Sequence, residues 1–105
     1  MKESESGYKL LLTYDISPQH SQEYYRFVLG RYVPVMQAMG LEMSDAWHTA
    51  YGDFPGRLVG FVARDRETIE ELLEDETWSS LNDELQRFVT DFNYKVIPYR
   101  PGFQF

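Results

Sequence analysis

The chain contains no cysteine, has fewer basic than acidic residues and lacks a long apolar run. Without cysteine it has no disulfide, no thiolate nucleophile and no cysteine-rich zinc site, which suits a reducing compartment. Its 10 Lys and Arg against 17 Asp and Glu give a formal net charge of -7 at pH 7, which repels nucleic acid and anionic lipid. No segment approaches the roughly 18 apolar residues of a membrane span. We therefore expect a soluble cytoplasmic protein that binds neither nucleic acid nor membrane.

Metal and cofactor motifs are also missing from the sequence. The two histidines, His20 and His48, are far apart and form no helical metal-binding motif. The acidic residues of segment 65–76 are typical of the solvated face of a short helix rather than of a set of metal ligands. No glycine-rich phosphate loop is present. We expect no metal site and no cofactor.

Aromatic residues, in contrast, are abundant. Eight Tyr, seven Phe and two Trp make up 16% of the 105 residues, and 43% of the chain is hydrophobic. This composition excludes a disordered chain, and the length is that of one domain. We expect residues 1–7 to form a flexible N-terminal tail and residues 8–105 to form a single domain.

The hydrophobic pattern predicts the order strand, helix, strand, strand, helix pair, strand. The expected strands are residues 8–16, 41–51, 57–64 and 93–100, and the expected helices are residues 18–39, 66–75 and 78–92. Ser17, Asp65 and Thr77 are predicted to cap the helices, and Pro34 predicts a kink or break between itself and Gly30. This split βαβ order predicts a ferredoxin-like α+β fold, in which a four-stranded antiparallel sheet has its helices on one face.

The two middle strands are expected to form a hairpin. We expect Asp45 to pair with Arg64 and His48 to lie opposite Phe61, because this register matches opposite charges. The large side chains that then share one face are Leu41, Met43, Trp47, Tyr51, Leu58 and Val62. Mostly small residues surround His48 on the other face, where they either let the helices sit close or leave a cavity.

The predicted sheet has apolar side chains on both faces, because Leu11 points away from the set formed by Tyr8, Leu10, Leu12 and Tyr14. One layer of helices covers only one of these faces. A second copy of the same sheet, packed face to face about a two-fold axis, is the simplest cover for the other. We therefore expect a homodimer that forms through the open sheet face.

By layout, residues 8–100 resemble the dimeric α+β barrel proteins, which include the antibiotic-biosynthesis-monooxygenase-like and NIPSNAP-like families. The likeness lies in the strand order, the length, the split second helix and the aromatic tail, and not in a signature motif. It implies paired sheets and a ligand cavity between the sheet and the helices of each subunit. The cofactor-independent monooxygenases of this group use an Asn near the end of the first strand and a Trp on the third. Tyr14 and Asp15 end the first strand here and residues 57–64 contain no Trp, so that activity does not carry over.

His48 is the candidate catalytic residue, because a histidine among alanines can take a proton from a bound phenol or enol at neutral pH. The alternative is a half-buried polar residue bonded to a neighbouring Tyr or carbonyl, since a lone ionisable residue is weak evidence for a site. We expect Tyr24, Phe61 and Trp78 to line the ligand cavity. The helical spacing of Trp78 also fits core packing, and fits it better than a stacking platform.

Two functions follow from these patterns. The first is a small-molecule-binding dimeric α+β barrel protein, with or without cofactor-independent enzyme activity on a phenolic or conjugated organic compound. The second is a non-catalytic dimerisation or interaction module whose aromatic residues are all structural. An enclosed cavity beside His48 would favour the first function, and a filled interior would favour the second.

Overall fold

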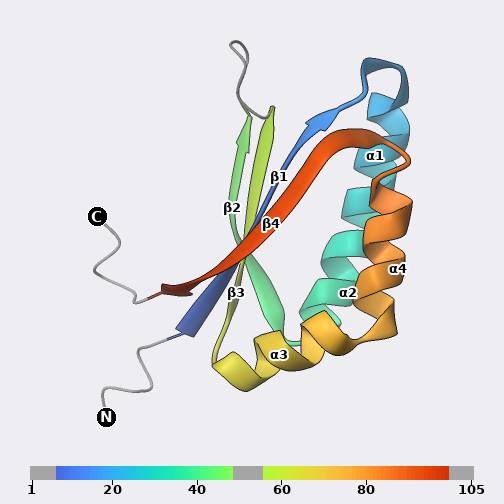
Figure 1. The fold of residues 1–105 in the computed structure, drawn as a ribbon. Coiled ribbons are helices and arrows are strands. Elements are labelled where there is room, and N and C mark those ends of the chain that lie inside the picture. The colour runs from blue at the N-terminus through green and yellow to red at the C-terminus, as the bar shows by residue number, and fades with distance from the viewer. Residues whose placement is uncertain (1–6, 49–55, 100–105) are drawn as a thin grey trace.

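The computed structural model describes residues 7–48 and 56–99, with the backbone alone described at His48 and Tyr99. The strands and helices follow one another along the chain in the predicted order (Figure 1). The strands are β1 (Gly7–Ile16), β2 (Leu41–His48), β3 (Arg57–Ala63) and β4 (Val89–Tyr99). The helices are the 3-10 turn η2 (Pro18–His20), α1 (Ser21–Phe27), the π-helix η3 (Val28–Tyr32), α2 (Val33–Ala38), α3 (Arg66–Glu74) and α4 (Glu76–Leu85). Most of the expected N-terminal tail, residues 1–6, lies outside the described residues.

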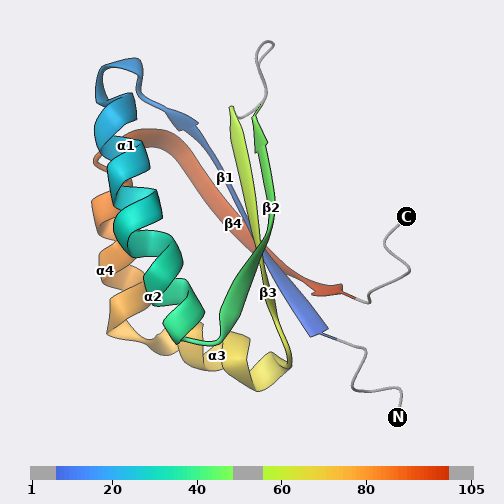
Figure 2. The ribbon, with the colours of Figure 1, turned by 180° about the vertical axis from the view of Figure 1, so that it is seen from behind.

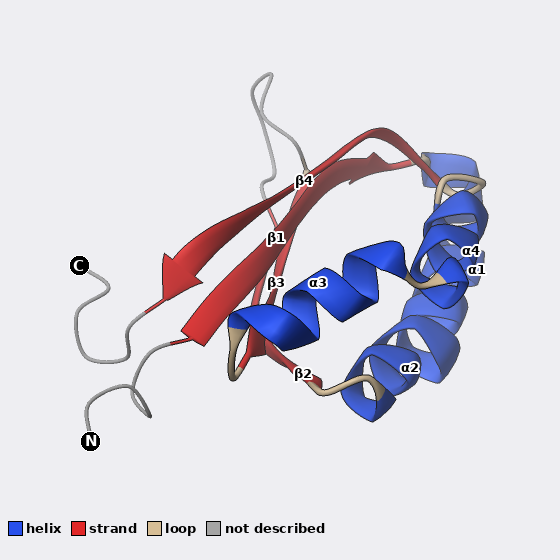
Figure 3. Cartoon of the chain, turned by 60° about the horizontal axis from the view of Figure 1, so that its bottom comes forward, coloured by secondary structure: helices blue, strands red, loops and turns tan. Residues whose placement is uncertain are grey.

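The four strands form one antiparallel sheet in the order β2-β3-β1-β4. All the helices lie on one side of this sheet, as the two opposite views show (Figures 1 and 2). No described element covers the other side, which we call the open face (Figure 3). The ferredoxin-like α+β fold is therefore confirmed. β4 is an edge strand, as the proline at position 98 predicts.

The first helical segment passes through Pro34 without a break (Figure 2). Proline has no N–H to donate, and its ring crowds the carbonyl group four residues earlier, that of Gly30. The chain accommodates it by widening into a π-turn, in which the Val33 amide donates to the Val28 carbonyl five residues earlier. The predicted kink or break is a π-turn, and it lets one apolar helix face continue past the proline.

Aspartates cap the paired helices α3 and α4. Asp65 caps α3 as predicted, and its Oδ1 accepts a hydrogen bond from the Thr68 amide at 2.9 Å. The predicted cap at Thr77 was wrong, because Asp75 stands two residues earlier and offers a charged acceptor. The Asp75 Oδ1 accepts from the Thr77 amide at 2.7 Å, so that α4 begins at Glu76.

The last strand begins inside the segment that was expected to be helical. Phe92 continues the apolar spacing of α4, but the backbone there pairs with β1, where Val89 lies opposite Ile16. Phe92 becomes a strand residue, and its ring stacks on that of Tyr14 with centroids 6.3 Å apart. The helix predicted over residues 78–92 was therefore too long at its C-terminal end.

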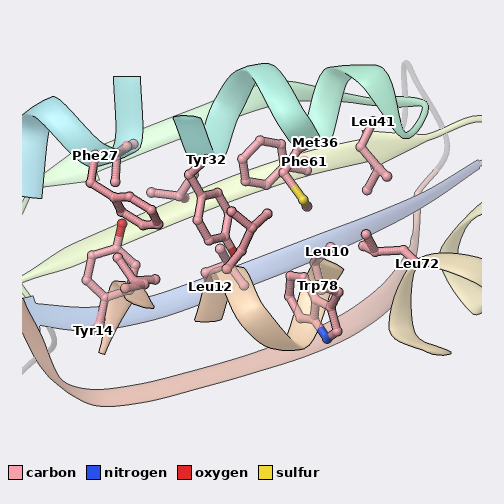
Figure 4. Close-up of a cluster of buried hydrophobic side chains, with 14 of the residues drawn as sticks. Leu10, Leu12, Tyr14, Phe27, Tyr32, Met36, Leu41, Phe61, Leu72 and Trp78 are labelled. Atoms are coloured by element: carbon pink, nitrogen blue, oxygen red, sulfur yellow. The ribbon is translucent and has the colours of Figure 1, made fainter. Parts of the chain in front are cut away.

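The core fills the space between the sheet and the helices (Figure 4). Its largest fully buried side chains are Leu10, Leu12, Tyr14, Tyr24, Tyr32, Met36, Leu41, Phe61, Leu72, Leu81 and Leu85. Three of these are tyrosines, whose hydroxyl groups require hydrogen-bond partners once they are buried. The sheet and the helices supply those partners, which places polar groups inside an otherwise apolar core.

Candidate functional site

The pairing of β2 with β3 differs from the predicted register by four residues from Asp45 to His48 and by five residues from Leu41 to Met43. His48 lies opposite Arg57, and Met43 takes the predicted place of His48 opposite Phe61. The same strand β3 pairs with β1, where Arg57 lies opposite Tyr14. The backbones of Tyr14, Arg57 and His48 therefore form one cross-strand row.

Asp45 shows why the predicted register was wrong. The sequence favoured pairing it with Arg64, but it lies opposite Gly60. Its carboxylate crosses β3 above Gly60 and accepts a hydrogen bond from the Lys9 ammonium group on β1 at 2.7 Å. The opposite charge that Asp45 requires is supplied by a more distant strand, because the glycine leaves room for the side chain to reach it.

A bulge at Ser44 also changes which face of the sheet the β2 side chains occupy. The pairing shifts between Met43 and Asp45, so the alternation of faces reverses at this point. Leu41 is buried in the core, whereas Trp47 lies on the open face and is 65% exposed. The predicted large-residue face containing both Leu41 and Trp47 was therefore wrong.

Two buried phenol groups meet beside this cross-strand row. The hydroxyl oxygens of Tyr14 on β1 and Tyr24 on α1 are 2.5 Å apart, and their rings meet edge to face at 5.7 Å. Burial raises the pKa of both hydroxyls. The hydrogen bond between them raises the pKa of Tyr14 further and partly offsets the rise at Tyr24. Both groups are therefore neutral at physiological pH.

Arg57 is the positive charge that acts on these hydroxyls, and its charge lowers the pKa of each. A side-chain hydrogen bond from Arg57 to the Tyr24 hydroxyl lowers the pKa of Tyr24 further, but burial outweighs both effects. It is partly buried, and its guanidinium lies 5.5 Å from the ring centroid of Tyr25. Its Nε is buried and has no hydrogen-bond partner. Within residues 7–48 and 56–99, no carboxylate forms an ion pair with it. We call Tyr14, Tyr24, Tyr25 and Arg57 the tyrosine–arginine site.

The site borders the exposed side of the first helical segment. Tyr25 is 40% exposed, and Leu29, four residues later, is 68% exposed. Residues at this spacing share one side of a helix, so an apolar strip extends away from Arg57 along the protein surface. The tyrosine–arginine site thus joins a buried polar pair to an accessible aromatic surface.

The sequence-predicted ligand residues all belong to the core cluster. Tyr24 is part of the tyrosine–arginine site and is fully buried. Phe61 packs against the Tyr32 ring, with ring centroids 6.1 Å apart (Figure 4). Trp78 meets the ring of Tyr94 edge to face at 5.5 Å. The side chain of His48 lies outside the described residues, as does any space beside it. The proposed roles of His48, Tyr24, Phe61 and Trp78 stay predictions.

Two polar features of the interior were missed in the sequence. Arg57 follows a turn and has no distinctive neighbours in the chain, so only strand pairing reveals that it lies beside Tyr14. Tyr32 donates a hydrogen bond to the Asn82 side chain at 2.7 Å, and both are buried. The apolar helical spacing around Tyr32 could have indicated that it is buried, but no local signal identifies its partner 50 residues away.

Other potential sites are weaker. An open depression of about 360 Å³ on α4 is lined by Ser80, Asp83, Glu84 and Arg87, which are polar or charged. In the described parts of the chain, no group of three or more His, Asp or Glu residues could hold a metal ion. Nor does any described helix combine the length and the hydropathy required to cross a membrane.

No family model and no curated protein sequence matches the chain. Solved structures match it by fold. A NIPSNAP family protein from Agrobacterium tumefaciens has a TM-score of 0.64 at 12% identity, covering 91% of this chain and 90% of that one. A putative antibiotic biosynthesis monooxygenase from Nitrosomonas europaea has a TM-score of 0.63 at 11% identity, covering 96% and 94%. These similarities establish a shared fold and confirm the resemblance in layout to the NIPSNAP-like and antibiotic-biosynthesis-monooxygenase-like proteins.

Proposed function

We propose that the protein binds a small organic molecule at the tyrosine–arginine site, as one subunit of a dimeric α+β barrel. The observation that carries this proposal is Arg57, a partly buried cation whose tyrosine neighbours are neutral. Removing a charge from water costs free energy unless a partner offsets that cost. A site that keeps such a charge without a carboxylate partner is suited to a ligand that supplies the missing contacts.

His48 remains the candidate acid/base within this proposal. The register places its backbone opposite Arg57, in the same cross-strand row as Tyr14. A histidine at this position is suited to exchange a proton with a phenolic or conjugated compound held by Arg57. The proposed enzyme activity is cofactor-independent, because it uses only this proton transfer and the hydrogen-bond donors of the site.

The proposed assembly is a homodimer formed through the open face. Apolar side chains on all four strands occupy this face, and they are Leu11, Trp47, Leu58, Val62 and Ile97. The Lys9–Asp45 ion pair neutralises two charges in the middle of the face. Lys95, opposite Leu11, and Glu42, opposite Val62, add one charge of each sign to this face. An apolar face with charges of both signs is compatible with self-association, because a face of one sign would repel its own copy across a two-fold axis.

A purely structural interaction module is the second candidate. It is favoured by the packing of Tyr24, Phe61 and Trp78, which are 0%, 1% and 5% exposed. Side chains buried to this extent contribute their full surface to the core and leave little of it for a ligand. In this case the dimer would be the functional unit, and the tyrosine–arginine site would serve stability only.

A thermal-shift screen distinguishes the two candidates. Wild type, Arg57→Ala and His48→Ala are screened against one library of phenols, aromatic acids and neutral aromatic compounds. Arg31→Ala is the matched control, because Arg31 is an exposed arginine on η3. We expect at least one compound to raise the melting temperature of wild type and of the control, since ligands stabilise the state they bind. The shift should be smaller in Arg57→Ala.

The possible results of the screen distinguish small-molecule binding from the interaction module. A library that stabilises none of the folded proteins contradicts small-molecule binding and favours the interaction module. Hits that persist unchanged in Arg57→Ala place the ligand elsewhere. A hit that still binds His48→Ala but is no longer converted supports the acid/base role of His48.

A further inference from the structure

The hydrogen-bonding groups of the tyrosine–arginine site indicate the class of its ligand. Resting on the proposed function, we infer that the site binds an aromatic compound through an anionic oxygen group, either a carboxylate or a phenolate. Three features of the site lead to this inference. They are the excess of hydrogen-bond donors over acceptors, the absence of a carboxylate partner for Arg57 among the described residues, and the aromatic surface on which Arg57 rests.

Donors outnumber acceptors at the site. A guanidinium group has five N–H donors and no acceptor. Arg57 bonds to the Tyr24 hydroxyl, but its buried Nε has no partner among the described residues. The two phenol oxygens lie 2.5 Å apart, so one hydroxyl proton is used between them. Whichever tyrosine donates, the hydroxyl proton of the other is left to donate elsewhere. A ligand that completes this arrangement must bring acceptor atoms.

The charges around Arg57 also favour an anion. Among the described residues, Tyr14, Tyr24 and Tyr25 contact Arg57 or act on it electrostatically, and burial keeps Tyr14 and Tyr24 neutral. The carboxylate of Asp15, which follows Tyr14 in β1, instead accepts a hydrogen bond from the Gly56 amide at 2.5 Å. Within the described part of the chain, Arg57 is thus a local positive charge without a carboxylate partner, although the net charge of the full chain is -7.

The geometry favours a single planar anion over a phosphate. Arg57 offers one planar fork, which matches the two oxygens of a carboxylate. Phosphate sites usually combine several cations or backbone amides at a glycine-rich turn or helix start, and the described residues of this site provide neither. One cation and one free hydroxyl proton therefore fit a singly charged group.

The aromatic part of the ligand is indicated by Tyr25. Its ring lies beneath the guanidinium and meets the ring of Tyr24 edge to face, with centroids 4.9 Å apart. Because Tyr25 is 40% exposed, a second ring can approach Arg57 from solvent and pack against it. An aliphatic acid would satisfy Arg57 but would gain less from this surface.

Matched probes test the inference by titration calorimetry at constant ionic strength. The probes are benzoate, its neutral isostere benzamide, a nitrophenol above its pKa, acetate and inorganic phosphate. We expect benzoate or the nitrophenolate to bind at least about tenfold more tightly than benzamide, since hydrogen bonds to charged groups are the stronger ones. Acetate and phosphate should bind more weakly than the aromatic anion. Comparing benzoate with nitrophenolate decides between carboxylate and phenolate.

Three variants test whether the preference for the anion over the amide depends on Arg57 and Tyr24. Arg57→Gln should abolish the preference for benzoate over benzamide, and Arg57→Lys should reduce it, because lysine lacks the planar fork. Tyr24→Phe keeps the ring but removes one donor, so it should weaken the anion more than the amide. Arg31→Gln is the control and should leave both affinities unchanged. Circular dichroism melting verifies that each variant is folded.

Several results would overturn the inference. Benzamide binding as tightly as the aromatic anions would do so, as would phosphate binding equally well, or an unchanged preference in folded Arg57→Gln. If Arg57→Gln fails to fold, the wild-type comparison of anion with amide still decides. Neutral compounds as the only hits of the library would contradict the anionic class while leaving small-molecule binding intact. A library without any hit contradicts the proposed function itself.

Discussion

Gly60 is the residue on which the centre of the open face depends. It lies between Asp45 on one neighbouring strand and Leu11 on the other. A Cβ at this position would lie 2.9 Å from the Asp45 carboxylate and 3.3 Å from the Leu11 side chain. The missing side chain therefore allows Asp45 to cross the strand and reach Lys9. A single glycine thus converts two charges on separate strands into one ion pair.

The substitution Gly60→Ala should displace the Asp45 carboxylate and separate it from Lys9. The ammonium group of Lys9 holds the pKa of Asp45 below its ordinary value, so this pKa should rise in the variant, as NMR titration of the carboxyl would measure. A lowered pKa in the folded state stabilises the protein above the unfolded-state pKa, and this stabilisation is lost as the pH falls through the folded value. At neutral pH the free energy of unfolding should therefore be about 0.5–1 kcal/mol lower in the variant than in wild type. On acidification the variant should lose less stability than wild type does.

Gly30→Ala is the matched control for this prediction. A Cβ at Gly30 has no atom within 4 Å, and the residue lies in a helical segment where alanine is favoured. It should leave the pKa of Asp45 unchanged. An identical Asp45 titration in Gly60→Ala and wild type would contradict the role assigned to Gly60.

Among the secondary-structure elements, α3 and α4 show how the helix starts are determined. Asp65 accepts from an amide three residues later, whereas Asp75 accepts from an amide two residues later. Both aspartates also place negative charge at the positive end of the helix dipole. The carboxylate of Asp75, and not the hydroxyl of Thr77, therefore defines where α4 begins.

Asp75→Ala should destabilise the protein by about 1 kcal/mol, because it removes the acceptor for the Thr77 amide. Thr77→Ala keeps that amide and should cost much less, which makes it the matched control. Urea denaturation at neutral pH measures both. A larger loss in Thr77→Ala than in Asp75→Ala would show that the cap predicted from the sequence is the one that matters.

For the whole molecule, the helices leave one side of the sheet uncovered. Trp47 stands on this open face, whereas Leu29 stands on the helical segment. The two are almost equally exposed, at 65% and 68%. They differ in their surroundings, since Trp47 belongs to an apolar sheet face and Leu29 to a helix surface. Only the first surface is suited to pack against a second sheet.

Trp47→Glu should therefore weaken the proposed homodimer, and Leu29→Glu should not. Both changes place the same charge at an exposed apolar position, so solubility and net charge are matched. Sedimentation at micromolar concentration should give a dimer for wild type and Leu29→Glu and a larger monomer fraction for Trp47→Glu. A wild-type protein that sediments as a folded monomer, with a melting temperature independent of concentration, would contradict the dimer.

Much of the fold could be predicted because its signals are local. The period of two in β1, the Asp65 cap and the apolar spacing of the helices are properties of neighbouring residues. Of the other predicted caps, Ser17 makes no side-chain capping bond and Asp75 takes the place of Thr77. The boundary errors arose where local and tertiary preferences compete. Phe92 fits a helix by spacing but lies in a strand, because β1 pairs with the residues on both sides of it. Leu41 and Trp47 share a face by simple alternation, until the bulge at Ser44 separates them.

The candidate site was predicted only in part, because it depends on strand register. His48 and Tyr24 could be singled out by residue type and position in the sequence. Arg57 could not, since its relation to Tyr14 exists only when β3 pairs with β1 in one particular alignment. The charge match between Asp45 and Arg64 favoured another alignment, and nothing local in the chain shows that Lys9 would be the partner instead.

The sequence by itself determined the order of the elements, the sheet with helices on one side and the apolar surplus on the other side, because periodicity and chain length specify these. The tertiary structure decided the register, the π-turn, the helix ends and the neighbours of Arg57. These depend on contacts between residues far apart in the chain, whose free energies outweigh local preferences only after the strands and helices have packed together.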